Sequence, residues 1–291
     1  MWYNAVMESV RVKAFSKLNL TLFITGIKDG YHMLDSVVTT VDLYDLIVIK
    51  KRRDKQVFIT MHGQGSEAIA FEENNAVKAA KAFIEAYGTN GADITIYKNI
   101  PMGLGMGGSS ADSAGVLNGL SKLYKVDDFA GLKILADGTG SDTRYMLSGG
   151  YARLFGRGDE VLPIESNLRL NFLLLAPNER VSTAQCFKTF DSLGTFGGNS
   201  DKIQQAITDG DKYSLKLGNA LTLSAKSLSK EVETAFEQLS SFDPIAVNMT
   251  GSGSGVFALF ENAEYCAYAK SRYTGAFTPY CLKTYLPKKS K

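Results

Sequence analysis

Cysteine and long apolar runs are scarce in this chain, and each shortage argues against a class of protein. The three cysteines (Cys186, Cys266 and Cys281) are widely separated, and no pair has metal-binding spacing. The odd count and the absence of a disulfide framework predict reduced thiols and a cytoplasmic compartment. The longest apolar stretches, such as residues 171–176, are far shorter than the roughly 20 residues that a membrane helix needs. The N-terminal residues also lack the apolar core of a signal peptide.

Charge of a single sign is also lacking. The 32 lysine and arginine residues nearly balance 30 aspartate and glutamate residues, which gives a formal net charge of +2. Without a strong positive field, the chain is not expected to bind nucleic acid. Apolar mass is plentiful, because 45% of the 291 residues are hydrophobic, enough for a sizeable core and two domains. The near-zero net charge and the absence of an obvious large apolar stripe leave both a monomer and a homodimer open.

Apolar periodicity predicts strands interleaved with helices without strict βαβ alternation, which is typical of the α+β class. Strands are predicted over residues 10–25, 37–49 with breaks at Asp42 and Asp45, 55–62 able to pair with 37–49, 92–97, 152–155, 168–176, 246–250, 256–260 and 281–285. Helices are predicted over residues 75–87, 110–124, 129–135, 201–206, 230–239 and 263–272. A change of pattern near residues 160–163 predicts an N-terminal domain of residues 1–160 and a C-terminal domain of residues 161–291.

A glycine-rich loop lies between the strand at 92–97 and the helix at 110–124, and reads PMGLGMGGSSADSAG from Pro101 to Gly115. Glycines permit positive φ and remove Cβ atoms, so consecutive N–H groups can converge on a phosphate. The helix that follows adds its free N–H groups and the positive end of its dipole. Ser109 and Ser110 can cap that helix or bind a phosphate oxygen, and Ser109 with Asp112 fits a capping box.

Other interpretations of the loop are open. Gly103, Gly105 and Gly108 satisfy G-x-G-x-x-G, with Asp127 and Asp128 at the spacing of a Rossmann ribose ligand. The preceding strand, however, alternates apolar and polar residues instead of forming the buried run of a parallel sheet. A Walker A loop is disfavoured because no Lys-Ser/Thr pair follows the last glycine. A glycine-rich turn that merely caps a helix is the remaining alternative.

The combination P-x-x-x-G-M-G-G-S-S-A-D-S-A resembles the phosphate-binding motif of the GHMP small-molecule kinases. Met106 stands where that family usually has leucine, and Ser109 stands where close members usually have a third glycine. Neither change removes the backbone donors of the loop.

Further stretches resemble one branch of that superfamily, the 4-diphosphocytidyl-2-C-methyl-D-erythritol kinases. They are SKLNL at 16–20, KDGYH at 28–32, GSD at 140–142, TAQCFK at 183–188 and MTGSGSGVFA at 249–258. The chain departs from the branch at Thr143 and Arg144, which replace a small hydrophobic pair after the aspartate. The resemblance follows the right order over nearly the whole chain.

This resemblance implies an ATP-dependent kinase that phosphorylates the 2-hydroxyl of 4-diphosphocytidyl-2-C-methyl-D-erythritol in non-mevalonate isoprenoid biosynthesis. It also implies two α+β domains with the active site in the cleft between them. The N-terminal domain would resemble domain 2 of ribosomal protein S5, and the C-terminal domain a ferredoxin-like sandwich. The alternatives are another GHMP kinase, acting on homoserine, mevalonate or a sugar, and a nucleotide-binding protein without turnover.

The resemblance also implies roles for individual residues. Asp142 would accept the proton of the substrate hydroxyl or orient it, and Lys17 would keep that aspartate ionised. The implied ATP-binding residues are Asn74, Lys98, Pro101, Gly103, Gly105, Met106, Gly107, Gly108, Ser109 and Ser110. The implied substrate-binding residues are Asn19, Tyr31, His32, Thr183, Phe187, Lys188, Gly251 and Gly253. Mg²⁺ is expected with ATP, held by phosphates and water together with Ser110, without a protein-built metal cage.

Overall fold

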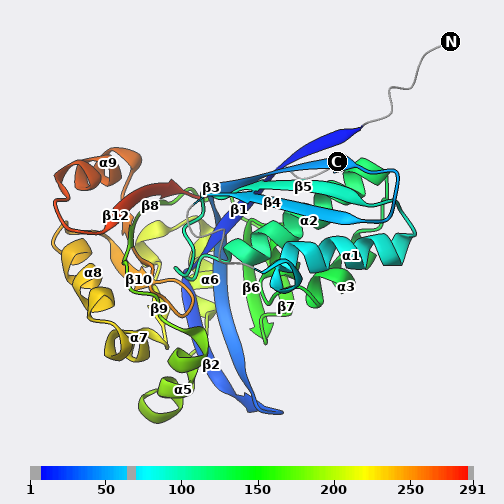
Figure 1. Ribbon diagram of the computed structural model, residues 1–291. Coiled ribbons are helices and arrows are strands. Elements are labelled where there is room, and N and C mark those ends of the chain that lie inside the picture. The colour runs from blue at the N-terminus through cyan, green and yellow to red at the C-terminus, as the bar shows by residue number, and fades with distance from the viewer. Residues whose placement is uncertain (1–7, 64–69, 288–291) are drawn as a thin grey trace. The chain divides into compact units, whose positions relative to one another are not determined.

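The computed structural model describes residues 8–63 and 70–287, and the described chain mixes helices and strands (Figure 1). The strands are β1 (Ser9–Asn19), β2 (Thr21–Lys28), β3 (Tyr31–Lys51), β4 (Val57–His62), β5 (Ala92–Tyr97), β6 (Tyr151–Gly156), β7 (Glu160–Ile164), β8 (Asn171–Ala176), β9 (Gly218–Asn219), β10 (Ala246–Met249), β11 (Val256–Phe260) and β12 (Thr278–Lys283). The helices are α1 (Asn75–Tyr87), α2 (Gly108–Tyr124), α3 (Phe129–Asp137), α4 (Thr143–Met146), α5 (Thr183–Leu193), α6 (Asp201–Asp209), α7 (Thr222–Leu228), α8 (Lys230–Ser240) and α9 (Ala263–Arg272), with short 3₁₀ turns η2 (Phe71–Glu73) and η3 (Lys212–Ser214). The α+β prediction is confirmed.

The chain divides into two compact units, and neither unit is one continuous stretch of sequence. Among the described residues, the first unit takes those within 1–16, 43–100 and 107–148. The second unit takes those within 17–42, 101–106 and 149–291. Residues 160–163, where the sequence pattern changes, lie in β7, which pairs with β6 inside the second unit.

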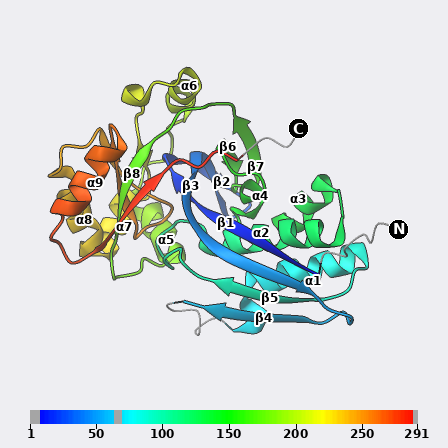
Figure 2. The same cartoon turned by 90° about the horizontal axis from the view of Figure 1, so that it is seen from above.

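In the first unit, β3 pairs antiparallel with β5, and β5 pairs parallel with β4. The prediction that residues 55–62 pair with residues 37–49 is therefore wrong, because β5 lies between these strands. Helix α1 has the predicted bounds, and it packs against α2 (Figure 2). Glycines in α2 let that helix approach β3, since a Cβ at Gly115 would lie 2.7 Å from Ile47 Cδ1.

Neither Asp42 nor Asp45 interrupts β3 as the sequence predicted. Asp42 accepts the Lys283 N–H at 2.9 Å, and both oxygens of the buried Asp45 carboxylate have donors. One oxygen accepts the N–H groups of Asn99 and Ile100 at 2.6 and 2.8 Å, and the other contacts Lys98 Nζ. Lys98 Nζ also binds the Asp112 carboxylate on α2 at 2.5 Å. Burial raises the pKa of Asp112 to about 8, although the nearby Lys98 charge acts in the opposite direction. The three side chains thus join β3, the start of the glycine loop and α2.

In the second unit, β2 and the first part of β3 form a hairpin around Asp29 and Gly30. Both residues have positive φ, 51° and 78°, as a type I′ turn requires. The tight turn of the hairpin is confined to these two positions. The opposite edge of β3 pairs with β6, and β6 pairs with β7.

A second sheet in this unit has the order β10-β11-β8-β12 with antiparallel neighbours. The chain order strand, helices, strand, strand, helix, strand is the split βαβ arrangement of ferredoxin-like folds. Helices α8 and α9 pack on this sheet, and α9 has the predicted bounds (Figure 2). The buried cluster between them includes Leu173, Leu175, Val232 and Ala258.

Helices α4, α5 and α7 lie where the sequence analysis predicted none. In α5 the buried residues are Cys186 and Phe190 alone, so its apolar stripe is too narrow to give a periodic signal. The helix is nevertheless started by Ser182, whose side chain accepts the Gln185 N–H.

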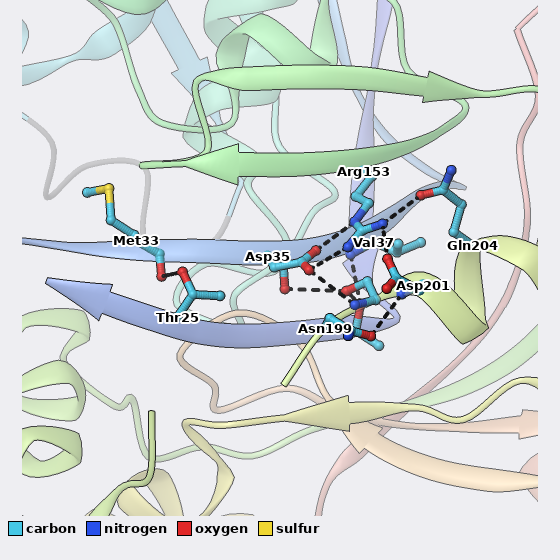
Figure 3. A network of polar contacts seen from close by, with 10 residues as sticks. Thr25, Met33, Asp35, Val37, Arg153, Asn199, Asp201 and Gln204 are labelled. Atoms are coloured by element: carbon cyan, nitrogen blue, oxygen red, sulfur yellow. Dashed lines mark hydrogen bonds and ion pairs between the residues drawn. The ribbon is translucent and has the colours of Figure 1, made fainter. Parts of the chain in front are cut away.

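Figure 3 shows a polar network that fixes the start of α6 to β3 and β6. Arg153 on β6 makes a two-pronged ion pair with Asp35 on β3, at 2.8 and 2.6 Å. The same guanidinium reaches Asp201 at 2.7 Å, and Ser200 N donates to Asp35 at 3.1 Å. Burial raises the pKa of the Asp35 carboxyl, but the hydrogen bonds from Arg153 and Ser200 outweigh it and leave the pKa below the usual value.

Replacing Lys98 by methionine should lower the free energy of unfolding by about 3–5 kcal/mol, because the buried side chains of Asp45 and Asp112 both lose their shared cationic donor. Chemical denaturation measures this change. Lys81→Met is the matched control, since Lys81 pairs with Glu72 on the surface and its loss should change stability by only about 0.5 kcal/mol. Equal effects of the two substitutions would contradict the role given to Lys98.

The Asp35 network should lose strength in acid. The pKa of Asp35 is lowered by folding, so its stabilisation is present above pH 3.8 and disappears as the pH falls through the folded-state pKa. The difference in unfolding free energy between the wild type and Asp35→Asn should therefore shrink below pH 3.8. A difference that stays constant down to pH 2 would rule this out.

Candidate active site

The backbone of the glycine loop alternates between left-handed and ordinary conformations. Gly103, Gly105 and Gly107 have φ values of 77°, 73° and 71°, a region that favours glycine. The intervening Leu104 and Met106 are buried, so their side chains anchor the loop in the protein. Such alternation turns successive N–H groups toward one side and forms an anion-binding nest.

The first part of the loop rests on the Thr250–Gly255 turn, within the second unit. A Cβ at Gly105 would lie 2.1 Å from the Thr250 carbonyl oxygen, and one at Gly255 would lie 2.6 Å from the Leu104 carbonyl oxygen. Thr250 Oγ1 donates to the Gly105 carbonyl at 3.1 Å, and Ser254 N donates to the Gly103 carbonyl at 3.2 Å. Gly105 and Gly255 are therefore required by the close approach of the two backbones, and the Gly251–Gly255 turn packs directly on the glycine loop.

Helix α2 begins at Gly108, and its N-cap is Gly107, without a side-chain cap. The predicted capping box of Ser109 and Asp112 is wrong, because Asp112 binds Lys98 and Ser109 is already inside the helix. Ser109 Oγ instead accepts a hydrogen bond from Asn75 Nδ2 at 3.0 Å. The N–H groups of the first turn are thus left for another acceptor.

Asn19, the last residue of β1, is hydrogen-bonded to both Lys17 and the Gly251 turn. Its Oδ1 accepts hydrogen bonds from Lys17 Nζ and from Gly251 N at 2.9 Å, and Thr250 Oγ1 lies 3.3 Å from the same oxygen. Lys17 is itself buried, and its backbone N donates to the Met106 carbonyl at 3.1 Å. The structure therefore brings Lys17, Asn19, Gly251 and the end of the loop together within the second unit.

Asp142 lies in the first unit, immediately before α4. The preceding Gly140 has φ 146°, and a Cβ there would lie 2.7 Å from Ser110 Oγ and 2.9 Å from Thr143 Oγ1. Residues 140–143 are thus in contact with the first turn of α2. Thr143 is buried, with no hydrogen-bond partner for its hydroxyl among the described residues. Arg144 forms an exposed ion pair with Asp137 at 3.1 Å, so its substitution affects the surface.

Aromatic side chains gather in the second unit, where the β2–β3 hairpin meets α5. The His32 ring lies 4.8 Å from the Phe187 ring, centroid to centroid, and His32 Nε2 is 2.6 Å from Asp191 Oδ1. The guanidinium of Arg157 lies 3.8 Å from the centre of the Tyr31 ring. Lys188 follows Phe187 and is exposed. This surface can stack a planar ring and offers polar atoms at its edge.

The aromatic surface connects to the Gly251 turn through α5, since Thr183 Oγ1 and Ser252 Oγ are 2.9 Å apart. Gly253, with φ 88°, belongs to the same turn. Two predicted ATP-binding side chains are used in other ways. Asn74 caps α1 by accepting the Ala76 N–H and donates to Met61 Sδ, and the Lys98 ammonium is held by its two carboxylates.

Several residues of the site were missed from sequence. They are Asp45, Asn75, Asp112, Asp191 and Thr250. Asp45 carried a signal, because a charge in the middle of a β-branched run needs a buried partner. Asp191 lies four residues after Phe187, a spacing that is meaningful only once α5 is known to be helical.

The described residues contain neither a candidate metal-binding cluster nor a candidate membrane-spanning helix. Within residues 8–63 and 70–287, no group of three or more His, Cys, Asp or Glu side chains is placed to hold a metal ion. No helix in the same ranges is long and apolar enough to cross a membrane.

Comparison with known proteins gives one family along the chain. The model described as GHMP kinases N terminal domain matches residues 74–150, and that described as GHMP kinases C terminal matches residues 202–268. The 4-diphosphocytidyl-2-C-methyl-D-erythritol kinase of Clostridium beijerinckii is 33% identical over 278 residues, which cover 92% of this chain and 98% of that protein. The protein of the same name from Desulfitobacterium hafniense is 33% identical over 270 residues, covering 89% and 90%.

Solved structures agree. A crystal structure of 4-(cytidine 5'-diphospho)-2C-methyl-D-erythritol kinase matches with a TM-score of 0.80 and 28% identity, covering 94% of this chain and 98% of that one. A homoserine kinase from Cytophaga hutchinsonii matches with a TM-score of 0.72 over 98% and 97% of the two chains, but its 15% identity indicates a shared fold alone. The chain therefore belongs to the GHMP kinases, in the branch of the 4-diphosphocytidyl-2-C-methyl-D-erythritol kinases.

Proposed function

We propose that this chain transfers the γ-phosphoryl group of ATP to the 2-hydroxyl of 4-diphosphocytidyl-2-C-methyl-D-erythritol, a step of isoprenoid precursor synthesis. The observation that carries the proposal is the glycine nest packed on the Thr250–Gly255 turn, with Lys17 and Asn19 bound to the same turn and loop. The named relatives give the acceptor.

We assign phosphate binding to the N–H groups of residues 103–110. The alternating glycines and the uncapped start of α2 offer donors without a side chain in the way. Pro101 precedes this nest. Asn74 supports it by capping α1, and Lys98 supports it by binding Asp45 and Asp112. ATP would bring Mg²⁺, which neutralises phosphate charge, and the Ser110 hydroxyl is the side chain that we assign to its coordination shell.

We assign the chemistry to Lys17 and Asp142. The Asp142 carboxylate accepts the proton of the attacked hydroxyl or orients that hydroxyl, as phosphoryl transfer requires. Lys17 supplies positive charge, and Asn19 holds its ammonium in place. Burial of Lys17 strengthens this electrostatic effect because water screens it less.

We assign recognition of the cytidine part to the aromatic surface of Tyr31, His32, Phe187 and Lys188. Phe187 stacks on the pyrimidine, and His32 and Lys188 offer polar groups at its edge. Thr183, Gly251 and Gly253 link this surface to the loop and contact the diphosphate side of the substrate. The division of the chain into domains of residues 1–160 and 161–291 stays a prediction from sequence. So do the cytoplasmic location and the oligomeric state.

One assay tests the proposal. ADP release is measured with the cytidyl substrate, with homoserine, with mevalonate and without an acceptor. Turnover is expected with the cytidyl substrate alone. Turnover on homoserine or mevalonate without turnover on the cytidyl compound would replace the proposed substrate, and ATP binding without any turnover would favour a non-catalytic nucleotide-binding protein.

Asp142→Asn should keep the affinity for ATP but lower kcat by about 10²-fold or more, because the amide cannot accept the hydroxyl proton. Equilibrium ATP binding and steady-state rates measure the two effects. Asp137→Asn is the control, since Asp137 is an exposed partner of Arg144 and its variant should keep the wild-type kcat. An unchanged rate in Asp142→Asn would remove Asp142 from its assigned role.

Phe187→Ala should mainly raise KM for the cytidyl substrate, because stacking on a base contributes about 1–3 kcal/mol. Initial-rate kinetics at saturating ATP measure KM. Phe129→Ala removes another partly exposed phenylalanine, from α3, and should leave KM unchanged. An unaltered KM in Phe187→Ala would show that this ring does not stack on the substrate.

A further inference from the structure

Asp191 holds the His32 ring at the aromatic surface described above. The carboxylate lies on α5, one helical turn after Phe187, and its Oδ1 is 2.6 Å from His32 Nε2. The His32 ring also meets the Phe190 ring edge-on, with 6.2 Å between centroids. The imidazole is thus fixed by a hydrogen-bonded carboxylate on one side and by two phenyl rings on others.

The carboxylate also determines which ring nitrogen carries a proton. An ionised carboxylate can only accept, so His32 Nε2 must be the N–H donor to Asp191. In the neutral ring Nδ1 then has a lone pair and accepts hydrogen bonds. Among the described residues Nδ1 has no hydrogen-bond partner, and the His32 side chain is still 17% exposed, so a ligand can reach the ring.

We propose that Asp191 is a positioning residue that gives this kinase its preference for cytosine over uracil, by fixing His32 as an acceptor at Nδ1. Cytosine carries an amino group at the position where uracil carries a carbonyl oxygen. An acceptor pairs with the amino group and repels the carbonyl oxygen. This inference rests on the proposed function, because it concerns the base of the same substrate.

The test compares kcat/KM for the cytidyl substrate with kcat/KM for its uridyl analogue. The wild type should prefer the cytidyl substrate, and Asp191→Asn should lose about tenfold of that preference, since an amide can donate to Nε2 and leave the proton on Nδ1. Asp191→Glu keeps a carboxylate and should retain most of the preference. Asp209→Asn, on α6, removes another exposed aspartate and should not change it.

The outcomes separate the two claims. Wild-type turnover of neither nucleotide compound would refute the proposed function. Normal wild-type turnover with an unchanged ratio of kcat/KM values in Asp191→Asn would refute the role of Asp191. Equal melting temperatures of the variants exclude a general loss of folding as the cause.

A second measurement reads the tautomer directly. The chain has two histidines, so His62→Asn leaves His32 as the one imidazole in a ¹⁵N NMR spectrum. The expected spectrum shows a protonated Nε2 and a bare Nδ1, with the proton moved to Nδ1 when Asp191→Asn is added. A proton on Nδ1 in the presence of Asp191, with or without one on Nε2, would overturn the proposal.

Discussion

The close approach of two glycine-rich backbones is the constraint on which the candidate site depends. Gly105 and Gly255 lie so near the carbonyl groups of Thr250 and Leu104 that neither position has space for a Cβ atom. Because the contact is made by backbone, it fixes the course of the loop more tightly than side-chain packing would. Asn19 then ties Lys17 to the same turn, so the lysine, the turn and the loop form one hydrogen-bonded structure.

Charge buried around the loop has a supporting role. Lys98 lies between Asp45 and Asp112, and the Asp45 carboxylate accepts the two N–H groups just before the loop. A buried group of this kind adds little net stability compared with an apolar core, but it tolerates few alternative arrangements. The family resemblance implies that Lys98 binds ATP. In the first unit, however, its ammonium is already held by Asp45 and Asp112.

Much of this organisation was predictable from local sequence. The helix over 75–87 and the helix over 263–272 have the predicted bounds, because apolar periodicity and nearby caps are local properties. The glycine loop and its helix were also recognised in place. Asp45 was wrongly taken as a strand break, and α5 was missed, because each depends on a partner that is distant in sequence: Lys98 for the aspartate, and the sheet core for the narrow stripe of Cys186 and Phe190.

The sequence by itself determined the class of the fold, the position of the glycine loop and the family, since these reside in short motifs and in the order of elements along the chain. Only the tertiary structure decided what each polar side chain does. Asn19 holds Lys17, Asp112 binds Lys98 instead of capping α2, and Asp191 binds the His32 ring. The physical reason is that a hydrogen bond or ion pair is defined by distances between residues remote in sequence, and no local pattern records those distances.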